Sequence, residues 1–246
     1  MRKNGLVKRG IVIPHEHGGW AMVSVPFVTG MMAGRPQGMH LFLFLAWLFL
    51  YLSSYPLLQS LKRNRDRIHL VKWGAIYGFI AVLCLTPVVF RLPQLSYFGP
   101  ILLTLLLVNI WYVKQKSERA LLNDLCAILI FSLGGAAAYL LAGGGWDRTM
   151  LLIIVFNMLY FMGSVFFVKS VFRERKNERW LAYAKAYHLL LLIAPWLLGL
   201  PWMMVAYLFA LFRTFAFAGK VIRPMKVGII EIIGSVQYLL CAIIFM

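Results

Sequence analysis

A short polar stretch near the amino end, "IPHEHGGW" at residues 13–20, carries the densest group of reactive side chains in the sequence. His15 and His17 flank Glu16 just before the sequence turns apolar. Neutral imidazole is a common ligand of transition metals and haem, and a histidine oriented by a carboxylate can act as a general base. The third interpretation is a structural cap on the first helix. We list all three residues as candidate catalytic residues.

A serine–arginine pattern occurs twice, in "SSYPLLQSLKRNRD" (residues 53–66) and in "GSVFFVKSVFRERK" (residues 163–176), at an offset of 110 residues. The matched positions are Ser54 and Ser164, Ser60 and Ser170, Arg63 and Arg173, and Arg65 and Arg175. The planar fork of arginine suits phosphate groups. We therefore expect the two stretches to form a clamp for an anion. Ordinary basic loops, or loops that bind anionic lipid headgroups, are the alternatives.

Further polar residues lie singly in or beside apolar segments. They are Asn123, Asp124, Asn157, Lys169, His188, Arg213 and Glu231. Such residues are costly at membrane depth and usually serve a function or pair with each other. One interpretation is a polar cavity open to the cytoplasm, with Asp124 and Glu231 as catalytic groups and the others binding substrate. The alternative is a set of interfacial anchors plus one Arg213–Glu231 ion pair between adjacent helices.

The elements that position these residues are expected to be transmembrane helices. The chain has 246 residues, 62% of them hydrophobic and only 13% charged, with a mean hydropathy of +0.80, whereas about a quarter of the residues in soluble domains are charged. We predict an all-α polytopic membrane protein forming a single domain, residues 1–246. A cytoplasmic segment, 1–17, precedes nine spans near 18–34, 40–61, 73–90, 95–113, 125–143, 149–168, 186–199, 201–218 and 227–246.

The distribution of positive charge predicts the orientation of these spans. With the amino terminus inside, the cytoplasmic segments hold 21 of the 25 lysines and arginines. Positive residues accumulate in cytoplasmic loops of membrane proteins. The chain is therefore expected in the plasma membrane, with its amino terminus inside and its carboxyl terminus outside. We attribute the net charge of +17 to these loops. The partners expected for them are membrane lipids, and no nucleic-acid partner is expected.

The architecture resembles the UbiA-type intramembrane prenyltransferases. The serine–arginine repeat divides the chain into two parallel four-helix repeats plus a ninth helix. The resemblance implies a central cavity and special loops after the second and sixth helices, where that family binds magnesium and a prenyl diphosphate through spaced aspartates. Here those loops carry Asp66, Glu174 and Glu178 among arginines. No metal site is therefore carried over, magnesium is not predicted, and no other cofactor is identified.

A more specific resemblance rests on the amino-terminal stretch itself. "PHEHGGWAMVSVPF" resembles the YwiC-like bacterial membrane proteins. The exit of the sixth span is similar to theirs as well, with Lys169, Ser170, Arg173 and Arg175 followed by His188. This resemblance covers the whole chain and names a family without implying a reaction.

These observations lead to one main expectation and two alternatives. We expect a membrane-embedded, prenyltransferase-like protein that binds or transfers an anionic isoprenoid or other lipid-like substrate from the cytoplasmic leaflet. Arginines would take the part that metal-bound aspartates have in the UbiA family. A transporter or lipid-binding protein without chemistry is the first alternative. A haem- or metal-handling protein that uses residues 15–17 is the second.

Overall fold

The computed structural model describes residues 10–14, 17–62 and 66–246, and all regular structure within them is helical. The α-helices are α1 (His17–Met32), α2 (Met39–Ser60), α3 (Arg67–Arg91), α4 (Phe98–Lys114), α5 (Leu121–Leu141), α6 (Arg148–Val171), α7 (Glu178–Leu197), α8 (Met204–Phe217) and α9 (Pro224–Phe245). Two short 3-10 helices, η1 (Pro93–Tyr97) and η2 (Pro201–Met203), precede α4 and α8. The prediction of an all-α chain is confirmed for the described residues.

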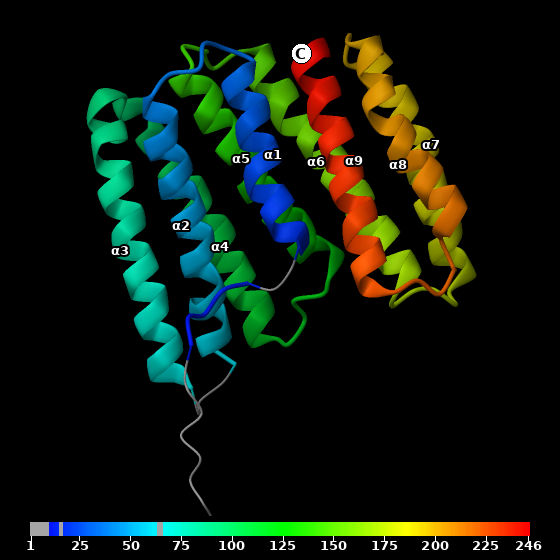
Figure 1. The fold of residues 1–246 in the computed structure, drawn as a ribbon, viewed down its shortest axis with the longest axis horizontal. Coiled ribbons are helices and arrows are strands. Elements are labelled where there is room, and N and C mark those ends of the chain that lie inside the picture. Colours follow the sequence, from blue (N-terminus) through cyan, green and yellow to red (C-terminus); the bar gives the residue numbers. More distant parts are fainter. Residues whose placement is uncertain (1–9, 15–16, 63–65) are drawn as a thin grey trace, which may run out of the picture.

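The helices run up and down, so that their ends gather at two opposite faces (Figure 1). The starts of α1, α3, α5, α7 and α9 share one face with the ends of α2, α4, α6 and α8. We call this face the basic end, because most of the described lysines and arginines lie on it. The connections at the opposite end contain only Arg35, Arg91 and Arg148 as basic residues, and the carboxyl terminus lies there (Figure 1).

Six of the helical segments in the described part are long and apolar enough to cross a membrane: Met39–Ser60, Arg67–Arg91, Pro93–Lys114, Leu121–Leu141, Arg148–Val171 and Pro224–Phe245. The other three fall short for different reasons. Helix α1 has 16 residues, and the η2–α8 segment, Pro201–Phe217, is also short. Helix α7 has 20 residues but carries Glu178, Arg179 and Lys185 in its first half.

Two helices begin well before the apolar spans expected from the sequence, because charged residues extend a helix beyond its apolar part. Helix α3 begins at Arg67, and α7 begins at Glu178, where the sequence predicted starts at 73 and 186. The first turn of α7 is capped by Asn177, whose side-chain oxygen accepts a hydrogen bond of 3.2 Å from the Trp180 N–H.

Helices α1 and α5 cross closely near the middle of the bundle (Figure 1). A Cβ on Gly30 would collide with the carbonyl group of Gly135, and a Cβ on Gly135 would collide with the Pro26 carbonyl oxygen. Only residues without a side chain allow two helix backbones to approach this far. Around this crossing, α5 and α6 supply much of the buried core.

Candidate functional site

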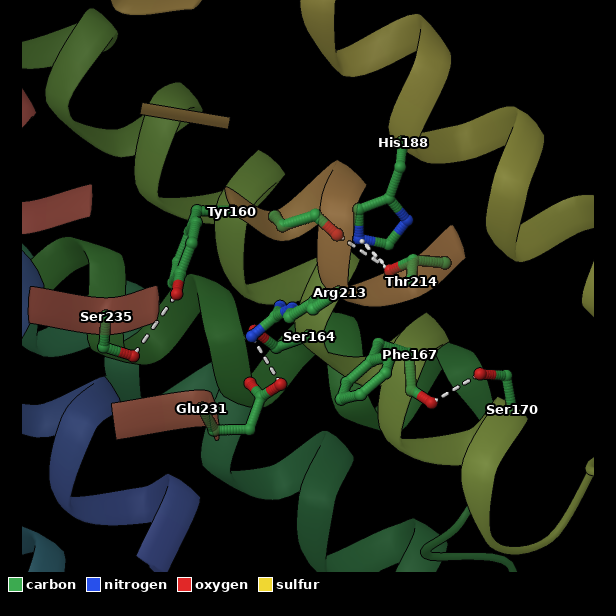
Figure 2. A network of polar contacts seen from close by, with 10 residues as sticks. Tyr160, Ser164, Phe167, Ser170, His188, Arg213, Thr214, Glu231 and Ser235 are labelled. Carbon is green, nitrogen blue, oxygen red and sulfur yellow. Dashed lines mark hydrogen bonds and ion pairs between the residues drawn. The ribbon is translucent and has the colours of Figure 1, made fainter. Parts of the chain in front are cut away.

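A buried ion pair joins α8 to α9 (Figure 2). The Arg213 Nη1 pairs with the Glu231 Oε1, and the Arg213 Nη2 donates to the Ser164 hydroxyl on α6 at 2.9 Å. The Arg213 side chain has no exposed surface, whereas 15% of the Glu231 side chain is exposed. The alternative prediction of an Arg213–Glu231 pair between adjacent helices is confirmed.

Aromatic rings from α6 enclose the guanidinium group. Its central carbon lies 5.8 Å from the Tyr160 ring centroid and 5.0 Å from that of Phe167. Such rings attract the cation through their π faces, and they exclude water from the pair. The Arg213 Nε has no hydrogen-bond partner among the described residues. Sequence reasoning missed Tyr160, although it lies four residues before Ser164 and therefore on the same helix face.

Next to Arg213 in the chain, Thr214 meets a buried histidine from α7 (Figure 2). The His188 Nδ1 lies 2.7 Å from the Ala184 carbonyl oxygen, to which only a protonated nitrogen can donate. The Nε2 is then an acceptor in the neutral ring, and the Thr214 hydroxyl lies 3.2 Å away. That hydroxyl has one proton, and it donates to the nearer Ala210 carbonyl oxygen at 2.9 Å. His188 and Thr214 are both fully buried. The sequence predicted His188 as a binding residue but did not identify its threonine partner.

Two basic loops lie side by side at the basic end. The Gly219 N–H donates to the Ser170 carbonyl oxygen at 3.2 Å, which docks the α8–α9 loop (218–223) on the end of α6 and the α6–α7 loop (172–177). Gly219 has a φ of +81°, a conformation that favours glycine. We call these two segments the basic loop pair. Their basic residues are Arg173, Arg175, Lys176, Lys220 and Arg223, all at least partly exposed.

A second ion pair joins the end of α6 to the start of α5. The Lys169 Nζ lies 2.6 Å from the Asp124 Oδ2 and also donates to the Arg119 carbonyl oxygen at 2.9 Å. The neighbouring Asn123 donates its side-chain amide to the Glu118 carbonyl oxygen at 2.8 Å. The predicted catalytic Asp124 and the predicted binding residues Lys169 and Asn123 therefore each have partners within the protein.

Glu118 connects this region to α2. Its carboxylate lies 2.7 Å from the Lys62 ammonium group. The hydrogen bond from Lys62 holds the pKa of the Glu118 carboxyl below its ordinary value. The start of α5 is thus tied to the ends of both α2 and α6, the two helices that carry the serine–arginine pattern.

The predicted hydroxyl and amide groups deeper in the helices bond to their own backbone. Ser54, Ser60 and Ser170 donate to carbonyl oxygens three residues earlier, at 2.7–2.8 Å. Asn157 donates to the Ile153 carbonyl oxygen at 2.8 Å, and its side-chain oxygen is buried without a partner among the described residues. The three serines therefore have their hydroxyl protons engaged, while Asn157 keeps an unused acceptor.

Several predicted residues lie outside the description. His15, Glu16, Arg63 and Arg65 are among the residues not described, and of His17 only the backbone is, at the start of α1. The expected clamp between the two arginine clusters is therefore not tested.

The segment before these histidines does have a defined place, because it lies along α3. The His69 Nε2 is 3.1 Å from the Gly10 carbonyl oxygen, and the Tyr77 hydroxyl donates to the Val12 carbonyl oxygen at 3.1 Å. No cluster of three or more His, Cys, Asp or Glu side chains suited to a metal ion occurs in the described part of the chain.

Comparisons with known proteins place the chain in a family. The model of the YwiC-like protein family matches residues 13–139. The Uncharacterized protein YwiC of Bacillus subtilis is 39% identical over 234 residues, covering 95% of this chain and 98% of that protein. An Uncharacterized protein of Haemophilus influenzae is 34% identical over 221 residues, covering 90% of this chain and 92% of its own. No solved structure matches. The chain therefore belongs to the YwiC-like family.

Proposed function

We propose that this protein is a membrane-embedded, UbiA-like protein that binds an anionic, lipid-like molecule of the isoprenoid phosphate class at its basic end. The observation that carries the proposal is the docking of the basic loop pair through the Gly219–Ser170 hydrogen bond. It brings two cationic segments, separated by more than forty residues of sequence, to one place at the basic end.

The charge of the basic loop pair favours a phosphate group. The two loops contain five basic residues and a single acid, Glu174. That acid accepts a hydrogen bond of 2.8 Å from the Asn177 side chain, which engages one of its carboxylate oxygens. Three of the five are arginines, whose parallel N–H groups match phosphate oxygens. An isoprenoid tail would remain in the bilayer beside the exposed apolar helix faces.

The helix bounds support the UbiA-like repeat that forms part of this proposal. Shifting α2 by the sequence offset of 110 residues gives 149–170, which coincides with α6 (Arg148–Val171). The same shift takes α3 to 177–201, over α7 (Glu178–Leu197). In the proposed orientation all nine helices enter the membrane, and the basic end faces the cytoplasm, as the positive-inside rule requires.

Transport is a second candidate, favoured by a cavity at the opposite end. This cavity of about 210 Å³ is lined by Arg148, Thr149, Leu152, Gly199, Leu200 and Met246. The twelve residues of α6 between Leu152 and Ser164 span about 18 Å. Phe156 and Tyr160 are fully buried in that interval. A transport path would have to open this core, so binding from the basic end is the simpler proposal.

The test is thermal stabilisation of the purified protein by prenyl diphosphates, with and without a chelator of divalent cations. A ligand at about 100 times its dissociation constant stabilises by about 2.7 kcal/mol. We expect stabilisation that survives chelation and is lost in Arg173→Ala/Arg175→Ala. The matched control is Arg35→Ala/Arg91→Ala, which removes the same charge from the opposite end. No stabilisation by any prenyl diphosphate, or equal loss in both variants, would refute the proposal.

A further inference from the structure

Arg213 has a buried N–H donor that meets no acceptor among the described residues. A guanidinium group has five N–H donors and cannot lose its proton in a protein. Among the described residues, Nη2 bonds to Ser164 and Nη1 pairs with Glu231, whereas the fully buried Nε has no partner. Buried polar groups are normally satisfied. The missing partner must be an acceptor, because arginine offers only donors.

The environment of Arg213 divides into a fixed part and a replaceable part. The fixed part comes from α6, which supplies the Ser164 hydroxyl and the rings of Tyr160 and Phe167. The replaceable part is the carboxylate of Glu231 on α9. Its side chain is 15% exposed against 0% for Arg213, but the Oε1 that pairs with Arg213 is buried. Ser164 is shared, because its hydroxyl also hydrogen-bonds with the Glu231 carboxylate, whereas the two rings contact Arg213 without the glutamate.

We propose that Arg213 is an internal anion receptor, and that Glu231 occupies its acceptor position until a phosphate-class anion displaces it. This inference deepens the proposed function and rests on it. A phosphate group offers more acceptor oxygens than a carboxylate, so it can bond to Nε as well as to the Nη groups. Binding exchanges one buried ion pair for another, so the receptor charge is never left uncompensated.

The position of Arg213 relative to the basic loop pair supports this exchange. Ser164 lies six residues before Ser170 on α6, which corresponds to about 9 Å along the helix axis. Arg213 lies four residues before the end of α8 (Phe217), about 6 Å along that axis. To reach the receptor, an anion gathered by the loops would have to displace the fully buried side chains of Phe167 and Val171 as well as Glu231. The loops concentrate the anion, and Arg213 selects it.

The test compares the affinity for geranyl diphosphate of the wild type and of Glu231→Gln, by calorimetry in nanodiscs of uncharged lipid. Removing the competing carboxylate should raise the affinity at least about tenfold, or 1.4 kcal/mol. The matched control is Glu178→Gln, which removes the same charge from an exposed position at the basic end and should change the affinity less than about threefold. Equal affinity for wild type and Glu231→Gln would overturn the inference.

Two further variants complete the test. One shows whether Arg213 is the receptor, and the other replaces Glu231→Gln if that variant does not fold. The pair Arg213→Gln/Glu231→Gln removes both charges while retaining polar side chains, and should bind no more tightly than wild type. If it binds as tightly as Glu231→Gln, Arg213 is not the receptor. If Glu231→Gln does not fold, Glu231→Asp, with a carboxylate withdrawn by one methylene, should bind more tightly than wild type, and unchanged affinity would overturn the inference.

The possible outcomes distinguish a failure of this inference from a failure of the proposed function. Binding by wild type that is lost in Arg173→Ala/Arg175→Ala but unchanged in Glu231→Gln leaves the proposed function standing and refutes the receptor. No binding by either wild type or Glu231→Gln refutes both. Inorganic diphosphate distinguishes the source of the anion. Binding of inorganic diphosphate as tight as that of geranyl diphosphate would identify a free phosphate ligand, and much weaker binding would identify a lipid-like one.

Discussion

Replacing Arg213 by methionine tests whether the buried ion pair is as interdependent as its geometry indicates. The substitution removes the cation but leaves the Glu231 carboxylate and the Ser164 hydroxyl in place. Removing one member of a buried pair costs about 3–5 kcal/mol, because the other charge stays without compensation. Glu231 keeps 15% exposure and can relax partly, so we expect the lower part of this range, about 3 kcal/mol.

The double variant Arg213→Met/Glu231→Gln should recover much of this loss. With both charges absent, no uncompensated charge remains, and replacement of a whole buried pair is often close to neutral. The coupling between the two substitutions should be at least about 2 kcal/mol. Equilibrium unfolding in mixed micelles, followed by the fluorescence of the eight tryptophans, measures each free energy of unfolding.

The control for this cycle is Arg223→Met, which removes a cation from an exposed position. It should alter the free energy of unfolding by less than about 0.5 kcal/mol. A loss below about 1 kcal/mol in Arg213→Met, or additive losses in the double variant, would refute the view that Arg213 and Glu231 are a coupled, water-excluded pair.

Three further predictions concern the framework around the site. Gly30→Ala should lower the free energy of unfolding by about 3 kcal/mol through overpacking, whereas Gly99→Ala, where the new Cβ meets nothing within 4 Å, should be near neutral in the same unfolding assay. Asp147 caps α6 through a hydrogen bond of 3.0 Å from the Met150 N–H, which lowers the pKa of its carboxyl. Its stabilisation should be present above the ordinary pKa of aspartate, about 4, and lost as the pH falls through the depressed value; a thermal-unfolding pH series in which Asp147→Ala loses the same stability at every pH would contradict this. Lys169→Met should destabilise more than Lys176→Met by about 1–3 kcal/mol, because only Lys169 is paired with a half-buried carboxylate, and equal melting temperatures would argue against that pair.

The helical framework was predictable because long apolar runs separated by basic loops leave few alternatives. The start of α7 was not predictable, because Arg179 and Lys185 interrupt the apolar pattern in the first half of the helix. The α1–α5 crossing escaped prediction for a different reason. Gly30 and Gly135 are more than a hundred residues apart, and nothing in either segment indicates which glycine meets which backbone.

The candidate site was predictable in its residue types but less so in its pairings. Arg213 and Glu231 stand out because charges are rare in apolar segments, and their helices adjoin in sequence, which favours a pair. The partnership of Lys169 with Asp124 could not be read from the chain, because it depends on how α5 packs against α6. This ion pair engages Lys169 and Asp124 with each other, so neither of these expected site residues is free to act on a substrate.

Photo-crosslinking with a light-activated prenyl diphosphate, followed by mapping of the labelled peptides, tests the central claim most directly. The account predicts labelling in residues 172–177 or 218–223, competed by unlabelled prenyl diphosphate and lost in Arg173→Ala/Arg175→Ala. Labelling confined to the opposite end, around Arg148 and Gly199, or labelling that unlabelled ligand does not compete, would contradict it.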